Sequence, residues 1–315
     1  MSFSAVNYLN YISKQINIYV GTFVYIFGNI NNILCFIIFL STKRLTKNAS
    51  SIYLIAVSIA NLVILNTSFL SRVILPTNFN LDPVLISSTW CKLRQYFGHV
   101  SATFSLFCTS WAMIDQYLLT SKNIYFRQFS TPKNAYYVIL STLMFSILHS
   151  TPLIIYNQLN ISSLTNITSC SLSSNMIYQN YVAYFVLPFI LGFIPGIITI
   201  IFTILTYSNI NSLHRQEMRT QIQQQLTKMV IGQNILFLID NIAYTGQNIY
   251  TLLTVSKSKA DSYLAYENIG LTIINIFGYA GYTFSFIIYI VVSSSIRKHF
   301  KELIKKFLNY LMCHQ

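Results

Sequence analysis

The sequence predicts an all-α membrane protein, a bundle of seven transmembrane helices. Of its 315 residues 54% are hydrophobic and 9% are charged, whereas about a quarter of the residues of a soluble domain are charged. The apolar residues gather into seven windows, each long enough to cross a hydrocarbon core of about 30 Å. These windows cover approximately residues 18–40, 51–75, 88–120, 135–156, 181–207, 229–253 and 266–292.

The third window differs from the others because polar residues recur along it. From Cys91 to Asp115 a helix would span roughly 36 Å, at about 1.5 Å per residue. The polar and small residues inside this stretch are His99, Ser101, Thr103, Ser105, Cys108, Thr109 and Ser110. Unpaired polar groups are costly in lipid. We therefore expect a central helix that is surrounded by the other helices.

The distribution of positive charge predicts the orientation of the chain. The net charge is +13, but no Gly-rich or aromatic-interleaved basic stretch indicates nucleic-acid binding. With the N-terminus outside, 14 of the 20 Lys and Arg fall on the cytoplasmic side. They are Lys43, Arg44, Lys47, Lys122, Arg127, Lys133, Arg215, Arg219, Lys228, Arg297, Lys298, Lys301, Lys305 and Lys306. The positive-inside rule then predicts a multi-pass plasma-membrane protein with an extracellular N-terminus and a cytoplasmic C-terminus.

This orientation divides the chain into three parts. Residues 1–16 form a short extracellular segment without the layout of a cleaved signal peptide. Residues 17–293 form the seven-helix membrane domain, and residues 294–315 form an amphipathic helix and a short cytoplasmic tail that contact membrane lipid. Glycosylation sequons at Asn160 and Asn166 lie in an extracellular connection. Cys313 is either a palmitoylation site or a free cytosolic thiol.

Several short motifs accompany the seven spans: Gly28-Asn29, Ala60-Asn61-Leu62, Asp115-Gln116-Tyr117 and Ser285-Phe286-Ile287-Ile288-Tyr289. With them, residues 15–308 resemble a rhodopsin-like (class A) G-protein-coupled receptor. The sequence Ala112-Met113-Ile114-Asp115-Gln116-Tyr117 and the later Phe129-Ser130-Thr131-Pro132-Lys133 are similar to invertebrate orphan receptors related to FMRFamide-type neuropeptide receptors. The resemblance implies an extracellular ligand and a heterotrimeric G protein on the cytoplasmic face.

The resemblance also implies roles for individual residues. It pairs Cys91 with Cys170 in a disulfide bond. It implies an intramembrane polar network that contains Asn29, Asn61, Ser105 and Ser285. Asn61 stands where the family usually has an aspartate that helps to bind sodium, and we therefore expect no tight sodium site.

The coupling motifs depart from the family pattern. Gln116 replaces the arginine of the family's Asp-Arg-Tyr triplet, between Asp115 and Tyr117. Gln116 carries no fixed charge and therefore cannot form the arginine's ion pair. Tyr289 matches the tyrosine that moves inward on activation. Residues 208–292 contain no Trp or Pro, so the sixth helix has no proline to kink it.

The ligand class follows in part by exclusion. Gly98 stands where amine receptors have an aspartate, and residues 266–292 contain no lysine for the Schiff base of an opsin. A peptide or a small polar ligand remains. The candidate pocket residues are Arg94, Gln95, His99 and Asp240. For His99 the alternative is a packed, hydrogen-bonded histidine, and for Asp240 a structural partner of a nearby Asn or Gln.

Two other classes of function compete with a G-protein-coupled receptor that binds such a ligand. One is a non-signalling or atypical seven-helix protein, acting as a scaffold, decoy or heteromer partner, and Gln116 favours it. The other is a transporter or channel, which paired polar breaks would indicate. No metal cluster, nucleophile triad or phosphate loop indicates an enzyme, and no cofactor is expected.

Overall fold

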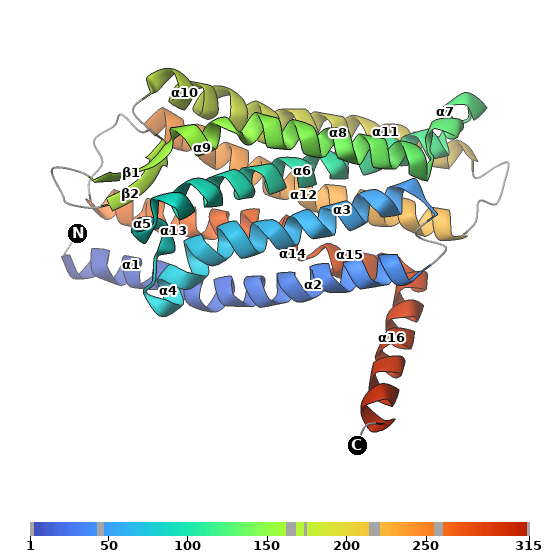
Figure 1. Ribbon diagram of the computed structural model, residues 1–315, viewed down its shortest axis with the longest axis horizontal. Coiled ribbons are helices and arrows are strands. Elements are labelled where there is room, and N and C mark those ends of the chain that lie inside the picture. The colour runs from blue at the N-terminus through green and yellow to red at the C-terminus, as the bar shows by residue number, and fades with distance from the viewer. Residues whose placement is uncertain are drawn as a thin grey trace.

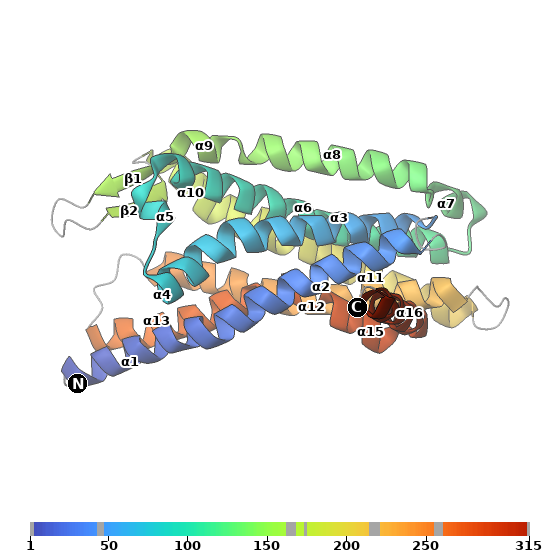
Figure 2. The same ribbon diagram turned by 60° about the horizontal axis from the view of Figure 1, so that its bottom comes forward.

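The computed structural model describes residues 3–42, 47–161, 168–172, 175–213, 221–254 and 261–313. Within these residues, the helices form seven rods that lie side by side (Figures 1 and 2). The first rod consists of α1 (Phe3–Ile16), η1 (Asn17–Gly21) and α2 (Thr22–Ser41), and the second of α3 (Ala49–Ile64), η2 (Leu65–Ile74) and α4 (Leu75–Phe79). The third rod is α6 (Ser88–Thr120), the fourth consists of α8 (Pro132–Ser150) and α9 (Pro152–Tyr156), and the fifth of α10 (Met176–Tyr181), η3 (Val182–Phe193) and α11 (Ile194–Leu213). The sixth rod is α12 (Gln221–Thr254), and the seventh consists of α13 (Asp261–Gly278), α14 (Ala280–Thr283) and α15 (Ser285–Val292). The segments η1, η2 and η3 are π-helical.

The two ends of the bundle differ. At one end lie the N-terminus, the short helix α5 (Pro83–Ile86) and a hairpin of strands β1 (Asn157–Ile161) and β2 (Thr168–Leu172) (Figure 1). At the other end lie the short helix α7 (Ile124–Phe129) and α16 (Ser294–Cys313), which turns away from the bundle axis. We call these the hairpin end and the α16 end.

Length and hydropathy alone identify part of the membrane domain. Among the described residues, four helical stretches are long and apolar enough to cross a membrane: Ala5–Ser41, Ala49–Phe79, Pro132–Tyr156 and Met176–Ile210. A fifth is Tyr263–Thr283 with Ser285–Val292, two helices bent by 50° that can form one broken span. The helices α6 and α12 contain 33 and 34 residues, so they are long enough, but polar side chains lower their hydropathy.

The polar side chains of α6 and α12 are buried inside the bundle. On α6 they are Arg94, Ser101, Thr103, Ser105, Thr109, Ser110, Asp115, Gln116 and Thr120, and on α12 they are Thr227, Gln233, Asn234, Asp240 and Thr245. α6 packs against α3, α8, α11 and α12. The structure thus confirms the prediction of a central third helix, whose polar groups face other helices instead of lipid.

Three helices extend beyond their predicted limits. The first rod is helical from Phe3, so much of the segment expected to be a polar N-terminus continues the first span. α12 begins at Gln221, eight residues before the predicted start, and it runs without a break, as expected without a proline. α16 continues to Cys313, so it takes up most of the segment in which a short tail was expected after the amphipathic helix. Polar helix ends carry no hydropathy signal, so the hydropathy windows did not include them.

A disulfide bond and a pair of strands connect the elements at the hairpin end. Cys91, in the first turn of α6, bonds to Cys170 on β2 with 5.8 Å between the Cα atoms, which confirms the predicted pairing. β1 and β2 are antiparallel, with Leu159 opposite Cys170. No strand was predicted in this segment. Asn160 lies on β1, whereas Asn166 lies outside the described residues.

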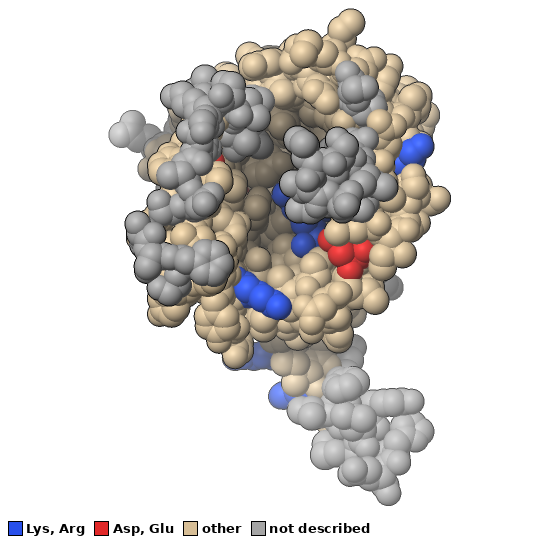
Figure 3. All heavy atoms as spheres, turned by 90° about the vertical axis from the view of Figure 1, so that its left-hand side faces the viewer, with Lys and Arg blue, Asp and Glu red and all other residues tan. Residues whose placement is uncertain are grey.

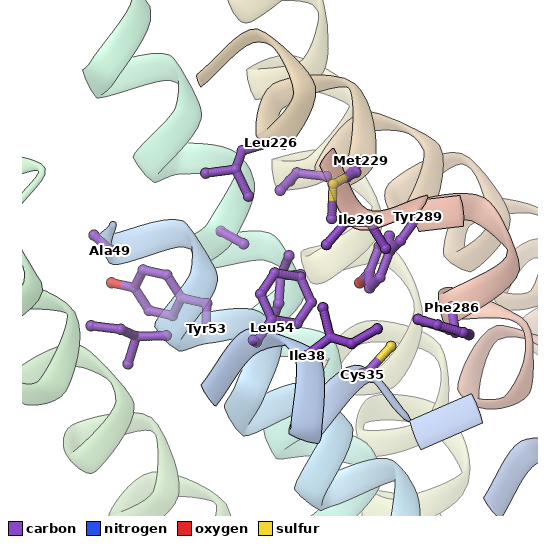
Figure 4. Packing of buried hydrophobic residues seen from close by; sticks show 14 of the residues in the cluster. Cys35, Ile38, Ala49, Tyr53, Leu54, Leu226, Met229, Phe286, Tyr289 and Ile296 are labelled. Atoms are coloured by element: carbon purple, nitrogen blue, oxygen red, sulfur yellow. The ribbon is translucent and has the colours of Figure 1, made fainter. Parts of the chain in front are cut away.

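A cluster of buried apolar residues holds the α16 end together. Figure 4 shows side chains of this cluster, which come from helices far apart in the sequence. They include Cys35 and Ile38 of α2, Tyr53 and Leu54 of α3, Leu226 and Met229 of α12, Phe286 and Tyr289 of α15 and Ile296 of α16. Ile296 is 1% exposed. The first turn of α16 is therefore anchored in the core of the bundle, while its later turns project from it.

The break in the seventh rod is stabilised by side chains of the first rod. Between α14 and α15 the helix is interrupted at Phe284. Asn32 donates to the carbonyl oxygen of Tyr282 at 2.8 Å, and Asn31 donates to that of Thr283 at 3.0 Å. Because buried carbonyl groups need partners inside a membrane bundle, these two asparagines compensate for the helical bonds lost at the break.

Gly28 allows this close approach, which generates a prediction on stability. A Cβ atom at Gly28 would lie 2.8 Å from Thr283 Oγ1 and 2.9 Å from Leu65 Cδ1. We expect Gly28→Ala to destabilise the fold by about 1–3 kcal/mol through overpacking, measured as a lower thermal unfolding midpoint of the full chain in detergent. Gly246→Ala is the control, since a Cβ there meets nothing within 4 Å. Equal effects of the two substitutions would contradict the packing described here.

Candidate functional site

A cavity of about 100 Å³ lies inside the bundle, between η2, α6, η3, α12, α13 and α14. Aromatic side chains form much of its wall: Phe237, Tyr244, Tyr279 and Tyr282. Two charged residues also line it, Asp240 on α12 and Arg72 on η2. Figure 3 views the hairpin end and shows that this end is hollowed, with Lys or Arg atoms inside the hollow. A site of this kind, apolar with a few polar groups, is typical of a small-molecule or ligand-anchoring pocket.

Asp240 is the acidic residue of this cavity. Its side chain is 4% exposed, and neither carboxylate oxygen has a hydrogen-bond partner of normal geometry. The backbone N–H of Gly281 lies nearby, and the carboxylate occupies the space where Gly281 has no Cβ atom. The alternative expectation, a structural bond to an Asn or Gln, is not what the structure shows. Its role in ligand binding stays a prediction.

Two arginines lie on the same side of the bundle. Arg72 lines the cavity, and Arg94, which is 9% exposed, lies within electrostatic range of Arg72, Tyr279 and Asp82. The Nε of Arg94 is buried without a partner. Arg94 was predicted as a pocket residue, whereas Arg72 was not. A charged residue within a predicted span was the signal that could have identified Arg72.

His99 and Gln95 do not line this cavity. His99 faces the fourth rod: its Nδ1 lies 2.9 Å from Ser150 Oγ, and its ring stacks on His149 with 5.4 Å between the centroids. The structure therefore gives His99 the packed, hydrogen-bonded role that the sequence analysis held as the alternative. The side chain of His99 points toward α8 and not into the cavity.

A buried polar network lies between the cavity and the α16 end. Asn61 donates to Asn32 Oδ1 at 3.2 Å and accepts from Ser105 Oγ at 2.7 Å. Asn29, which we expected in this network, lies nearer its edge and bonds to Asn66 at 2.6 Å in a more exposed position. Asn32 is the buried member of the first rod. Two adjacent asparagines within an apolar span, Asn31 and Asn32, were the feature of the sequence that could have indicated this.

The network does not fit a sodium ion. Both polar atoms of the Asn61 amide already have partners, and the amide carries no charge to balance a cation. In the part of the chain that the structure describes, no group of three His, Cys, Asp or Glu could hold a metal ion. The lack of a tight sodium site stays a prediction.

A second polar group joins the sixth and seventh rods. Tyr289 donates to Gln233 Oε1 at 2.7 Å, and Gln233 Nε2 donates to Ser285 Oγ at 2.8 Å. Tyr289 is 1% exposed and also packs edge-on against Phe39. Gln233 thus connects Ser285 and Tyr289, two residues singled out in the sequence, although it was not itself selected.

Two residues of the triplet at the α16 end of α6, Asp115 and Gln116, take part in a buried hydrogen-bonded cluster. Gln116, which is fully buried, donates to Ser50 Oγ on α3 at 2.5 Å and accepts from Thr227 Oγ1 on α12 at 2.5 Å. Ser50 in turn donates to Asp115. We call Ser50, Asp115, Gln116 and Thr227 the Gln116 latch. Tyr117 lies outside it and packs against Phe202. The latch ties the second, third and sixth rods together without an ion pair.

The uncharged, hydrogen-bonded amide of Asn61 leads to a prediction on sodium binding. We expect the thermal unfolding midpoint of the wild-type chain to be the same in sodium chloride as in choline chloride at equal ionic strength. Asn61→Asp supplies a carboxylate next to Ser105 and should make the midpoint rise with sodium. A sodium-dependent midpoint in the wild type, measured by differential scanning fluorimetry, would contradict this account of the network.

One family comparison agrees with the fold and with these sites. A family model described as "7 transmembrane receptor (rhodopsin family)" matches residues 31–302, which is most of the chain. No curated protein matches the chain. Proteins of this family are multi-pass plasma-membrane receptors and not enzymes. The chain, with its seven rods, its disulfide from α6 to β2 and its polar core, belongs to the rhodopsin family of seven-transmembrane receptors.

Proposed function

We propose that the protein is a G-protein-coupled receptor in which a ligand enters from the hairpin end and controls the Gln116 latch at the α16 end. The observation that carries this proposal is the latch itself. It joins three rods at the end opposite to the cavity. An interaction that holds helices together and that can be exchanged for other partners is suited to a two-state switch.

The latch replaces an ionic interaction by a neutral one. Gln116 provides donors and an acceptor but no charge, and its hydrogen bonds to Ser50 and Thr227 use both ends of its amide. On the proposed function, separation of α12 from α6 breaks the bond from Thr227 and opens a surface for the G protein. Neutral hydrogen bonds across membrane helices contribute about 0.6 kcal/mol on average. A modest ligand affinity difference between the two states therefore suffices to shift their populations.

The proposal includes an orientation and a ligand type. The hairpin end is extracellular, with Asn160 and Asn166 available for glycosylation, and the α16 end is cytoplasmic. A peptide is the favoured ligand, in keeping with the resemblance to neuropeptide-type receptors. α16 lies on the inner leaflet through residues such as Ile304, and palmitoylation of Cys313 would strengthen this contact. The excess of Lys and Arg near the α16 end supports this orientation.

The alternative is a rhodopsin-family protein that does not signal and acts as a scaffold, decoy or heteromer partner. The absence of an arginine at position 116 is the observation that favours it. The two proposals differ in a measurable property, since a receptor that couples must change its nucleotide-exchange activity when the latch is opened.

The test needs no ligand. Thr227→Val keeps the shape of a residue that is 3% exposed but removes the hydroxyl that bonds to Gln116. A buried acceptor left without its donor costs about 1–3 kcal/mol. We therefore expect basal nucleotide exchange on the matching purified G protein to rise about fivefold or more. Exchange is measured with each G-protein class in turn.

Thr142→Val is the matched control. Thr142 is 6% exposed, and its hydroxyl bonds within its own helix, to the carbonyl of Val138 at 2.7 Å. We expect this control to leave exchange unchanged. If the wild type, Thr227→Val and Gln116→Arg all fail to stimulate every G-protein class while folded at the cell surface, the coupling proposal is wrong and the scaffold alternative stands.

A further inference from the structure

The buried carboxylate of Asp240 needs a partner. An ionised acid inside a membrane bundle is costly unless it is paired, yet both oxygens of Asp240 lack a hydrogen-bond partner of normal geometry. Arg72 lines the same cavity, but no ion pair joins the two residues in the described part of the chain. Because Asp240 also lines a cavity, a cationic group from outside the chain can reach it.

The surroundings of Asp240 favour a planar cation. A guanidinium group binds both oxygens of a carboxylate in parallel, and neither oxygen of Asp240 has a hydrogen-bond partner of normal geometry, although the Gly281 N–H lies beside them. It also stacks on aromatic faces, and the aromatic wall of the cavity provides such faces. Phe237 and Tyr282 meet edge to face with 5.5 Å between their centroids. A compact ammonium group cannot form the two parallel hydrogen bonds or stack as a plane on the aromatic rings.

The arginines on the other side favour an anion. Arg72 lies in the cavity wall, and Arg94 is close enough to interact with it electrostatically. Two neighbouring guanidinium groups repel each other, and a carboxylate between them removes this repulsion. Asp82 interacts with Arg94 but does not line the cavity. The cavity therefore presents an acid on α12 and Arg72 on η2, while Arg94 of α6 lies close to Arg72 but outside the cavity lining.

We infer that the ligand presents a guanidinium group to Asp240 and a carboxylate to Arg72 and Arg94, as does a peptide whose free C-terminal residue is arginine. This inference rests on the proposed function, because it names the chemistry of the ligand of the same receptor. The cavity of about 100 Å³ holds the end group of such a ligand but not a whole peptide. The rest of the ligand extends toward the hollowed hairpin end (Figure 3).

Four matched dipeptides test the two charges separately. N-acetyl-Phe-Arg with a free C-terminus carries both charges, its C-terminal amide carries only the guanidinium, N-acetyl-Phe-citrulline carries only the carboxylate, and its amide carries neither. Binding is measured as the rise in thermal unfolding midpoint of the full chain in detergent, at probe concentrations up to about 10 mM because fragments bind weakly. We expect the doubly charged probe to bind tightest and the neutral probe weakest.

Substitutions assign each charge to its residue. Asp240→Asn should weaken the two arginine probes by about 10- to 100-fold, the range for a charged hydrogen-bonding pair, and should leave the citrulline probes unchanged. Arg72→Gln should weaken the two free acids and leave the amides unchanged. Glu267→Gln and Lys92→Gln are the controls, since they remove the same charges outside the cavity lining. The midpoint of each variant without probe shows that it is folded.

Three outcomes of the binding experiment would overturn the inference: no shift with any probe, equal shifts with all four, or full binding of the arginine probes to Asp240→Asn. The last is expected if Asp240 is a neutral, purely structural acid. Failure of the proposed function looks different, because the probes would bind as expected while no variant of the latch changed nucleotide exchange. Conversely, nucleotide exchange driven by a ligand without these charges would overturn the inference and leave the proposed function intact.

Discussion

The rest of the structure depends on one constraint, that a polar group inside the membrane bundle must find its partner within the chain. Asn32 provides such partners for polar groups of several helices at once. Its amide nitrogen donates to the carbonyls of Gly28 and Tyr282, both at 2.8 Å, and its oxygen accepts from Asn61. Asn61 then accepts from Ser105. Through these bonds the first, second, third and seventh rods are held in one register, and the break in the seventh rod is stabilised.

The constraint is met at some sites of the bundle and not at others. The core network and the Gln116 latch are bonded on both sides. At the cavity, by contrast, Asp240 has no partner of normal geometry. Since α12 carries both Asp240 and Thr227 on one unbroken helix, the two residues lie about 20 Å apart along one rod. On the proposed function, pairing of Asp240 with a ligand displaces α12, and this displacement reaches the bond between Thr227 and Gln116.

Much of the fold could be predicted from the sequence, because hydropathy and helix length record which segments cross the membrane. The central position of α6 followed from its polar residues, and the resemblance supplied the pairing of Cys91 with Cys170. The candidate site was harder to predict. Arg72, Gln233 and Thr227 were missed because their roles depend on which faces of different helices meet, and no pattern within one helix records that. The same reason explains why the sequence left two roles open for His99, which packs against α8 in the structure.

The missing prolines make sense when the sixth and seventh rods are considered together. α12 contains no proline and stays unbroken over 34 residues, so it transmits a displacement along its whole length instead of bending at one point. The seventh rod also contains no proline, yet it bends by 50° before Ser285. There, side-chain bonds from Asn31 and Asn32 replace backbone bonds, and side-chain bonds can be exchanged without unwinding a helix. The sixth rod is thus one unbroken helix, whereas the seventh has a break just before α15. The hydroxyl of Tyr289 on α15 bonds to Gln233 on α12. A displacement of α12 must therefore either carry α15 with it or break that bond.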